Sequence, residues 1–272
     1  MRATLKQTVP DPIWSRGSKI YWWWHNRGRH ALAKSTSAAW RANLRRLEAY
    51  RDRHQGERCF ILGNGPSLRQ TELALLKNEF TFGMNRIYLL FPELGFPTTY
   101  LVSVNELVLE QCAQEMQALR LPRFFTWRGR RFFQDDPHNL FLDTDYTEPA
   151  EFSGDMTGRV YEGYTVTFVA LQLAFFMGFD QAILIGVDHN FETKGPPNTT
   201  VTSTGDDPNH FAPNYFGKGF RWQLPDLEGS ERAYRLAQEA YTAAGRQVLD
   251  ATVGGKLEIF PKVEYETLFR YR

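Results

Sequence analysis

Polar residues stand directly after several apolar runs of this 272-residue chain, and their types suit ligand recognition. Asn64, Asn85, Asn105 and Asp188 each follow a run typical of a buried strand. An asparagine amide both donates and accepts hydrogen bonds, so it can bind a base, a ribose or a sugar without adding charge. A single asparagine in such a place is also a common turn residue. Because the carboxyl ends of parallel strands share one edge of a sheet, the whole set predicts a ligand site at that edge.

The segment DDPNHFAPNYFGKGF carries candidate groups for proton transfer and charge stabilisation. His210 is the predicted general base, because an imidazole titrates near neutral pH and can take a proton from an acceptor hydroxyl. Three neighbours could neutralise a departing phosphate: Tyr215, Lys218 and Arg221. The alternative for His210 is a hydrogen bond that only holds the loop together. His189 is a second histidine of this kind, with a supporting or structural role.

Acidic residues offer a different chemistry. Asp188, Asp206 and Asp207 could hold Mg²⁺ on a diphosphate, because Mg²⁺ prefers oxygen ligands. The CxxC and HExxH spacings of familiar metal sites are absent. The two cysteines, Cys59 and Cys112, are too few for a disulfide framework and indicate a reduced, cytoplasmic protein.

The stretch CFILGNGPSL at 59–68 predicts a first strand, a tight turn and a helix start. Gly63 and Gly65 would permit positive φ and let a ligand approach the backbone, and Pro66 suits a first helical turn. Ser67 offers a hydroxyl and an amide to a phosphate or nucleotide. The alternative is a tight turn without a ligand. The stretch is neither a P-loop nor a dinucleotide fingerprint, because no Lys-Ser/Thr pair follows and Leu68 replaces the third glycine.

The elements that must position these groups alternate between strands and helices, which predicts an α/β fold: a Rossmann-like, doubly wound, mostly parallel sheet with an N-terminal helical extension. Helical spacing of apolar residues predicts a helix from Ser37 to about His54 that leads into the core. We expect further strands at 79–83, 98–104, 123–127, 139–142, 181–187 and 247–249, and helices at 69–77, 106–118, 164–177, 230–244 and 263–269. The Pro-, Gly- and Asn-rich connection at 190–228 is long enough to be functional or mobile.

Charge is distributed unevenly along the chain. Residues 1–53 hold twelve Lys and Arg against three acidic residues, although the whole chain has a net charge of only +1. The segment IYWWWHNRGRH at 20–30 places tryptophans beside arginines, so residues 16–46 are a candidate contact for an anionic membrane surface. The alternative is that these tryptophans dock on the core. Nucleic acid is not an expected partner, because the rest of the chain is not basic.

The length suits a single α/β domain at 56–272 preceded by a basic, Trp-rich extension and helix at 1–55. No apolar run is long enough to span a membrane, and the N-terminus lacks the apolar centre of a signal peptide. We therefore expect a cytoplasmic protein, peripheral at most to the inner face of the membrane.

Four stretches carry a family resemblance: FILGNGPSL, FGMNRIY, GYTVTFVALQLAFFMGFDQAILIGVDHNF and GGKLEIFPKVEY. Over roughly residues 56–268 the chain resembles the 6-hydroxymethylpterin diphosphokinase MptE-like family. The same order of motifs is similar to the central domain of motility accessory factor glycosyltransferases and, more distantly, to the family 42 sialyltransferases. The resemblance to the latter implies a GT-A-like variant of the Rossmann fold, a CMP-activated nonulosonic acid donor, inversion at the anomeric centre and a loop histidine as base.

The resemblance also implies roles for individual residues. GNGPS at 63–67 matches the nucleotide loop, Asn85 and Asn105 match CMP-binding asparagines, and His210 matches the catalytic histidine. Thr165 or Thr167 matches a serine that contacts the nucleotide or sugar. The chain departs from the pattern after Asp188, where the sialyltransferases have tyrosines that stabilise the leaving phosphate. Tyr215 is a candidate substitute.

Three hypotheses follow. The leading one is a glycosyltransferase that moves a sugar from a CMP-activated donor to a cell-surface glycan acceptor and requires no cofactor. The second is transfer of diphosphate from Mg²⁺-bound ATP to a hydroxymethylated pterin, with Asp188 and Asp207 as metal ligands. The third is a nucleotide-binding module without catalysis.

Overall fold

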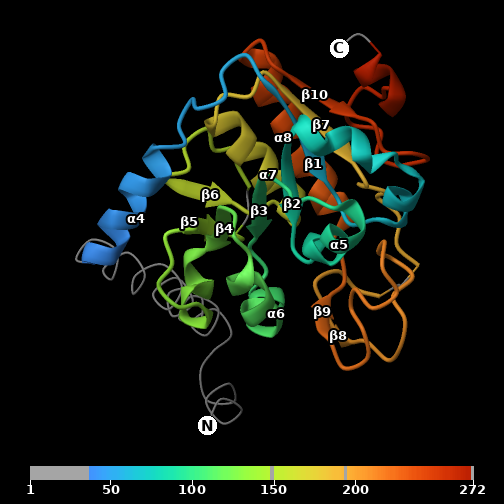
Figure 1. Cartoon of the computed structure of the whole chain (residues 1–272), viewed down its shortest axis with the longest axis horizontal. Helices are drawn as coiled ribbons and strands as arrows, with labels where there is room; N and C mark the ends of the chain where they lie inside the picture. The colour runs from blue at the N-terminus through green and yellow to red at the C-terminus, as the bar shows by residue number, and fades with distance from the viewer. Residues whose placement is uncertain (1–36, 148–149, 193–194, 271–272) are drawn as a thin grey trace, which may run out of the picture. The chain divides into compact units, whose positions relative to one another are not determined.

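The computed structural model describes residues 37–147, 150–192 and 195–270 (Figure 1). The chain divides into two compact units, Met1–Arg46 and Leu47–Arg272. The predicted Trp-rich segment at 20–30 lies outside the described residues, as does the larger part of the predicted membrane contact at 16–46. The second unit holds the sheet, and the expected division of the chain at residue 55 stays a prediction.

Eight strands form one sheet in which all neighbouring strands are parallel. Their order across the sheet is β10-β7-β1-β2-β3-β4-β5-β6. The strands are β1 (Arg58–Leu62), β2 (Phe80–Met84), β3 (Tyr100–Ser103), β4 (Arg123–Thr126), β5 (Asn139–Asp145), β6 (Arg159–Tyr161), β7 (Gln181–Ile185) and β10 (Gln247–Asp250).

The chain winds outward from β1 in two directions. It first runs through β2 to β6 on one side of β1 and then returns to place β7 and β10 on the other side. Strand order therefore reverses between β1 and β7, whose last residues, Leu62 and Ile185, are register partners. This confirms the predicted doubly wound α/β fold, and in such folds ligands bind beyond the carboxyl ends of the strands at the reversal point.

Helices cover both faces of the sheet. On one face α7 (Val166–Phe176) contacts β1, β2 and β3, and α8 (Leu227–Ala243) packs against α7 and β10. The other face carries α6 (Glu106–Ala118), the short α5 (Phe91–Leu94) and several 3₁₀ segments. Alternate side chains of β1 point to opposite faces, which explains why this strand must be apolar throughout.

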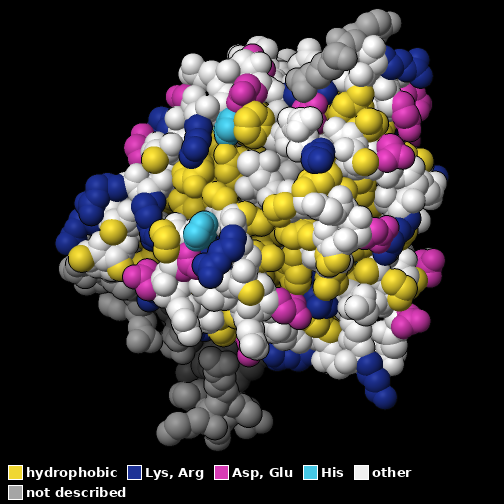
Figure 2. Space-filling view, viewed as in Figure 1, with side chains coloured by type: hydrophobic (Ala, Val, Ile, Leu, Met, Phe, Trp, Pro, Cys, Tyr) yellow, Lys and Arg dark blue, Asp and Glu magenta, His cyan; other side chains and the backbone are white. Residues whose placement is uncertain are grey.

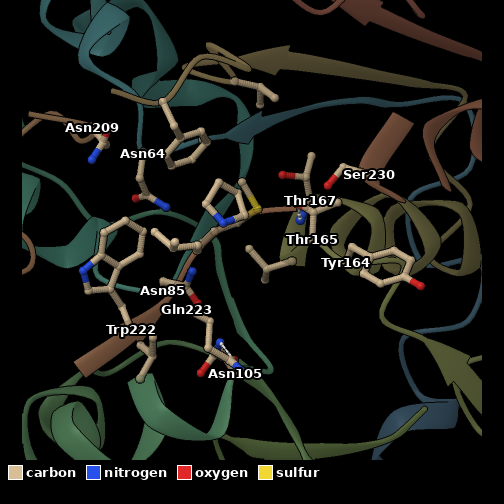
Figure 3. A pocket seen from close by; sticks show the side chains of 18 of the residues that line it. Asn64, Asn85, Asn105, Tyr164, Thr165, Thr167, Asn209, Trp222, Gln223 and Ser230 are labelled. Atoms are coloured by element: carbon tan, nitrogen blue, oxygen red, sulfur yellow. Dashed lines mark hydrogen bonds between the residues drawn. The ribbon is translucent and has the colours of Figure 1, made fainter. Parts of the chain in front are cut away.

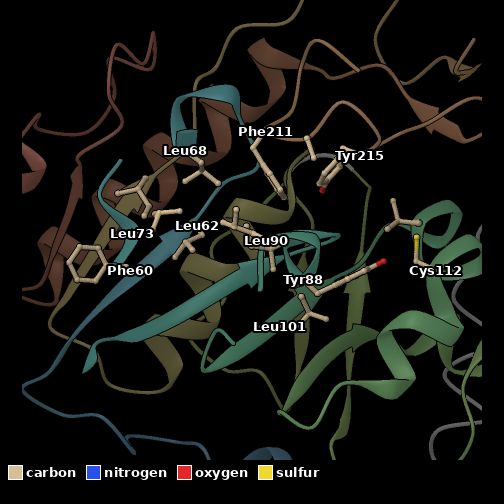
Figure 4. Packing of buried hydrophobic residues seen from close by; sticks show 14 of the residues in the cluster. Phe60, Leu62, Leu68, Leu73, Tyr88, Leu90, Leu101, Cys112, Phe211 and Tyr215 are labelled. Carbon is tan, nitrogen blue, oxygen red and sulfur yellow. The ribbon is translucent and has the colours of Figure 1, made fainter. Parts of the chain in front are cut away.

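A continuous apolar cluster lies on the α6 face (Figure 4). Phe60 and Leu62 of β1 pack there with Leu68 and Leu73 from the segment that follows the strand. Phe211, from the long connection before α8, belongs to the same cluster. The connection is thus part of the core on this side of the molecule.

The connection at 190–228, expected to be a long loop, contains a small antiparallel hairpin of β8 (Thr200–Thr202) and β9 (Arg221–Gln223). Phe216 stacks on Trp222 with ring centroids 5.4 Å apart and on Phe220 at 4.7 Å. These aromatic contacts bury the inner side of the hairpin segment. Apolar packing therefore holds much of this segment against the domain, in contrast to the predicted mobile loop.

Most predicted elements are confirmed, and the exceptions have local causes. The helix expected from Ser37 to about His54 is α4 (Ala38–Glu48), and Asp52 beyond it has a left-handed backbone (φ 52°) that a right-handed helix cannot contain. The helix expected at 69–77 is wrong in type, because an extended Thr71 separates two 3₁₀ segments. The 3₁₀ segments are Pro66–Gln70, Leu73–Asn78, Ile87–Leu90, Trp127–Phe132 and Tyr265–Phe269.

No helix among the described residues combines the length and the apolarity needed to cross a bilayer.

Candidate active site

A cavity of about 770 Å³ lies at the carboxyl edge of the sheet. The turns after β1, β2, β3 and β7 line it, together with the N-terminal turns of α7 and α8 and residues from β9. Asn64 and Asn85 line it with Thr165, Thr167 and Ser230 (Figure 3). The space-filling view in Figure 2 shows apolar side chains grouped across the middle of the viewed face, with charged side chains around them.

Asn64 lines this cavity and carries a buried hydrogen-bond acceptor. Its Oδ1 atom has no hydrogen-bond partner among the described residues. Its main-chain oxygen accepts a hydrogen bond from Phe211 N at 2.8 Å, which ties the turn after β1 to the segment that carries His210. A buried acceptor without a partner costs free energy, so a ligand that donates to Oδ1 would remove this penalty.

The glycines of the turn are explained by close packing of two strand ends. Neither Gly63 nor Gly65 has the positive φ that the sequence suggested. A Cβ on Gly63 would lie 2.1 Å from the main-chain oxygen of Gly186, and one on Gly65 would lie 1.8 Å from Asp188 Oδ2. Both glycines therefore let the turns after β1 and β7 meet. They also line the cavity, so the close approach of a ligand to their backbone stays a prediction.

Ser67 and Asp188 hold these two turns together. Ser67 Oγ donates to Asp188 Oδ2 at 2.7 Å, and Ser67 N donates to Oδ1 at 3.1 Å. Ser67 is buried and lies outside the cavity lining, whereas Asp188 is part of it. The predicted contact between Ser67 and a nucleotide is thus replaced by a contact with Asp188.

The other two asparagines differ in how their amides are used. Asn85 has a left-handed backbone (φ 51°), and its Oδ1 accepts from Ser103 Oγ at 2.9 Å, which leaves Nδ2 as the group for a cavity ligand. Asn105 caps α6: its Oδ1 accepts from Leu107 N at 2.9 Å, and its Nδ2 donates to Gln223 Oε1 of β9 at 3.0 Å. The amide of Asn105 thus fixes the cavity wall, as the turn-residue alternative anticipated.

Thr165 and Thr167 lie where α7 begins. Thr165 is the N-cap, with Oγ1 accepting from Thr167 N at 3.3 Å, and both threonines line the cavity. The first N–H groups of a helix carry partial positive charge, so this end of α7 favours an anionic ligand group. Both of the threonines that could match the serine of the sialyltransferases therefore lie at the same end of α7.

His210 lines the cavity and is held by Asp207. His210 Nδ1 lies 2.7 Å from Asp207 Oδ2, and the two side chains are 12% and 3% exposed. The imidazole stacks on the Tyr215 ring with centroids 4.1 Å apart and an interplanar angle of 7°. The carboxylate can only accept, so in a neutral imidazole Nδ1 carries the proton and Nε2 the lone pair, and no described residue bonds Nε2. This is the arrangement of an oriented general base.

Three of the predicted catalytic residues lie outside the cavity lining. Tyr215 is fully buried beneath His210, burial raises the pKa of its phenol, and its hydroxyl accepts a hydrogen bond from Arg86 N at 3.2 Å. Lys218 is exposed, and Arg221 pairs with Glu110 at 2.9 Å. Their expected role, neutralisation of a departing phosphate, does not fit these positions. The sequence places all three only a few residues from His210, but Tyr215 is buried beneath its ring, and Lys218 and Arg221 are exposed.

The two predicted metal ligands accept hydrogen bonds from protein donors. Asp188 accepts from Ser67, and Asp207 accepts from Asn209 N at 2.9 Å and Phe216 N at 3.2 Å in addition to His210. Among the described residues, no group of three or more His, Cys, Asp and Glu side chains is arranged to hold a metal ion. The carboxylates organise loops in this arrangement.

Arg86 supports the segment that carries His210, and sequence reasoning missed it. Its guanidinium donates to the main-chain oxygens of Asn214 and Tyr215, lies 3.5 Å from Glu115 and lies over the Phe220 ring at 5.4 Å. Arg86 therefore supports the platform on which His210 stacks. The sequence could have indicated Arg86, because it follows Asn85 directly in the MNRIY stretch.

Arg128 was also missed, and it lines the far end of the cavity with Glu106 and Glu162. Its Nε lies 3.0 Å from Glu106 Oε1, and its second amino nitrogen pairs with Glu162. Burial alone would lower the pKa of Arg128, but the two carboxylates raise it overall. The guanidinium is thus committed to protein partners in this structure.

Backbone strain is concentrated around the cavity. Five described non-glycine residues have positive φ, and four of them line it: Asn85, Tyr164, His189 and Asn198. The fifth, Asp52, follows α4. Strained conformations of this kind cost free energy and cluster at functional sites, because there the surroundings enforce them.

Comparison with known proteins supports the fold. No protein-family model and no curated protein matches the sequence. The chain is similar to the solved structure of the MAf glycosyltransferase from Magnetospirillum magneticum AMB-1, with a TM-score of 0.50 and 14% sequence identity. The match covers 83% of this chain and 38% of that protein, so the chain spans well under half of its length. At this identity the likeness shows a shared fold, and the resemblances to the MptE-like family and to the sialyltransferases stay predictions.

Proposed function

We propose that this chain is a glycosyltransferase that moves a sugar from a CMP-activated donor, with a nonulosonic acid such as sialic acid as the sugar, to a cell-surface glycan acceptor. The single observation that carries the proposal is the combination of two groups that have no hydrogen-bond partner among the described residues and belong to residues of one cavity. These groups are Nε2 of His210, whose ring Asp207 orients, and the buried acceptor Asn64 Oδ1. The fold shared with a MAf glycosyltransferase is consistent with transferase chemistry.

In the proposed reaction an acceptor hydroxyl attacks the anomeric carbon of the donor sugar. His210 Nε2 takes the proton of that hydroxyl as the new C–O bond forms. The bond between the anomeric carbon and the phosphate oxygen breaks, and its electron pair stays on the phosphate of the departing nucleotide. Asp207 keeps Nδ1 protonated and stabilises the imidazolium that results.

The donor would lie across the reversal point of strand order. Asn64 and Asn85 would bind the nucleotide through Oδ1 and Nδ2 respectively, and the first turn of α7 would face its phosphate. This assignment gives no metal ion a role. We further propose a cytoplasmic enzyme at the inner face of the membrane, since the basic, Trp-rich composition of 16–46 suits an anionic surface next to a membrane-bound acceptor.

The test is a thermal-shift panel of CMP, CDP, UDP, GDP and ATP, each with and without Mg²⁺, followed by a transfer assay with a CMP-linked nonulosonic acid. A ligand at 100 times its Kd that binds only the folded state stabilises it by about 2.7 kcal/mol. We expect CMP to raise Tm without Mg²⁺. A shift with ATP and Mg²⁺ alone would instead favour the pterin diphosphokinase, and binding without turnover of any donor would indicate a non-catalytic module.

A further inference from the structure

The proposed reaction leaves negative charge on a phosphate, and the cavity needs a group that stabilises it. Lys218 and Arg221 lie outside the cavity lining. His189 does line the cavity, in the turn after β7 at the reversal point. The inference that follows concerns this histidine and rests on the proposed transferase function.

The side chain of His189 is buried, and only one of its two ring nitrogens has a hydrogen-bond partner among the described residues. Its side chain is only 8% exposed, and its Nε2 lies 3.1 Å from Glu231 Oε1 of α8. The ring also meets Tyr234 edge-on, with centroids 6.4 Å apart. Nothing in the described part of the chain bonds Nδ1. The left-handed backbone of His189 (φ 53°) is a cost that its surroundings enforce.

The environment of His189 combines a helix N-terminus with the carboxylates of Asp188, Glu106 and Glu162, which line the same cavity. Ser230 and Leu227, from the first turn of α8, line the same cavity as Thr165 and Thr167 at the start of α7. The N-terminus of α7 adds partial positive charge to this space, whereas the Asp226 carboxylate caps α8 and accepts from Gly229 N at 2.7 Å. The negative charge of Glu231 is shared with Arg235, whose guanidinium lies 3.1 Å from Glu231 Oε2. A protonated imidazole at this place would add positive charge to that of the α7 N-terminus.

We propose that His189 is a catalytic residue that binds the phosphate of the departing nucleotide. In the proposed complex His189 is the imidazolium form, in which Nε2–H donates to Glu231 and Nδ1–H donates to a phosphate oxygen of the donor. As the bond between the anomeric carbon and the phosphate oxygen breaks, the electron pair stays on that oxygen and His189 strengthens its hydrogen bond without losing a proton. The acceptor proton goes to His210, so the two histidines act on opposite ends of the reaction.

The test compares the affinities of CMP and cytidine, because the two ligands differ by the phosphate. The variant is His189→Asn, since asparagine tolerates a left-handed backbone and removes the imidazole. We expect the Kd of CMP to rise about 10- to 100-fold, the effect of a lost charge-assisted hydrogen bond, and the Kd of cytidine to stay unchanged. Transfer should slow by about 10²- to 10³-fold. The matched control is His138→Asn, a histidine with a carboxylate partner outside the cavity lining.

The outcomes separate the two proposals. If wild-type protein binds CMP more tightly than cytidine and His189→Asn keeps the same ratio, the role of His189 is wrong while the transferase proposal stands. If wild-type protein binds neither, the CMP donor and the inference built on it both fail. Should His189→Asn not fold, Glu231→Gln takes its place, because it removes the charge that holds Nε2–H and should also reduce the preference for CMP over cytidine.

Discussion

The two edges of the sheet use histidine in different ways. At the amino edge, before β1, both ring nitrogens of His54 are satisfied: Nδ1 lies 2.6 Å from Glu57 and Nε2 lies 2.7 Å from the Tyr100 hydroxyl. His138, before β5, pairs with Asp136 at 2.8 Å and is partly exposed to solvent. Each of these histidines has a carboxylate partner, and neither lines the cavity.

At the carboxyl edge, His189 and His210 also have carboxylate partners, Glu231 and Asp207. Their second ring nitrogens have no bonding partner among the described residues, and neither has Nε2 of His138. The difference is that His189 and His210 are buried rings in a shared cavity, whereas the His138 side chain is 37% exposed. A carboxylate beside a histidine is therefore not diagnostic of chemistry. An open nitrogen on a buried, oriented ring is the better criterion.

The largest expected effect is a loss of transfer activity when a histidine at the carboxyl edge is replaced, but not when one at the amino edge is replaced. His210→Ala should lower kcat of transfer by about 10²- to 10⁴-fold, because it removes the proton acceptor. His138→Ala, at the amino edge, should leave kcat unchanged. Steady-state kinetics with circular dichroism as a folding check measure both. Near-wild-type kcat in folded His210→Ala would exclude the proposed base and remove the functional difference between the edges.

The second largest effect is a loss of stability, which tests whether the turns after β1 and β7 depend on close packing. Gly63→Ala should destabilise the protein by about 1–3 kcal/mol, because its Cβ would meet the main-chain oxygen of Gly186 at 2.1 Å. For a domain of this size, Tm should fall by about 2–12 °C in a thermal melt. Gly205→Ala is the matched control, since a Cβ there meets nothing within 4 Å. Equal Tm values for the two variants would contradict the packing explanation.

The smallest effect concerns stability at the amino edge. Tyr100→Phe removes the hydroxyl that bonds His54 Nε2, so it should cost about 1–2 kcal/mol and leave transfer activity unchanged. Burial raises the pKa of Tyr100 to about 12. The unfolded chain loses this proton near pH 10 and the folded chain only near pH 12, so the stability that Tyr100 contributes is lost as pH rises through this interval.

Denaturant titrations at pH 9 and pH 11.5 check this last prediction. The wild-type free energy of unfolding should fall more steeply between the two pH values than that of Tyr100→Phe. Equal slopes would show that Tyr100 does not ionise differently in the folded and unfolded states. Reduced transfer activity in Tyr100→Phe would contradict the view that the amino edge contributes to stability alone.

Local patterns predicted the framework of the fold. The apolar runs of β1 and β7 and the helix at 106–118 were visible in the sequence, because burial on both faces and helical spacing leave short-range signatures. The three-residue β6 was missed, since it has no apolar run. The pairing of His210 with Asp207 had a usable signal, an acid three residues before the histidine, but its orientation depends on the Tyr215 ring.

The sequence by itself determined the α/β class, the order of the strands along the chain and the polar residues that end them. Each of these depends on residue types within one short segment. Tertiary structure alone decided which of those residues share a cavity: it turned Lys218 and Arg221 outward, used Asn105 as a cap and brought His189 beside the first turn of α8. Such choices depend on contacts between segments tens of residues apart, as in the meeting of Gly63 with Gly186, and no local pattern encodes those distances.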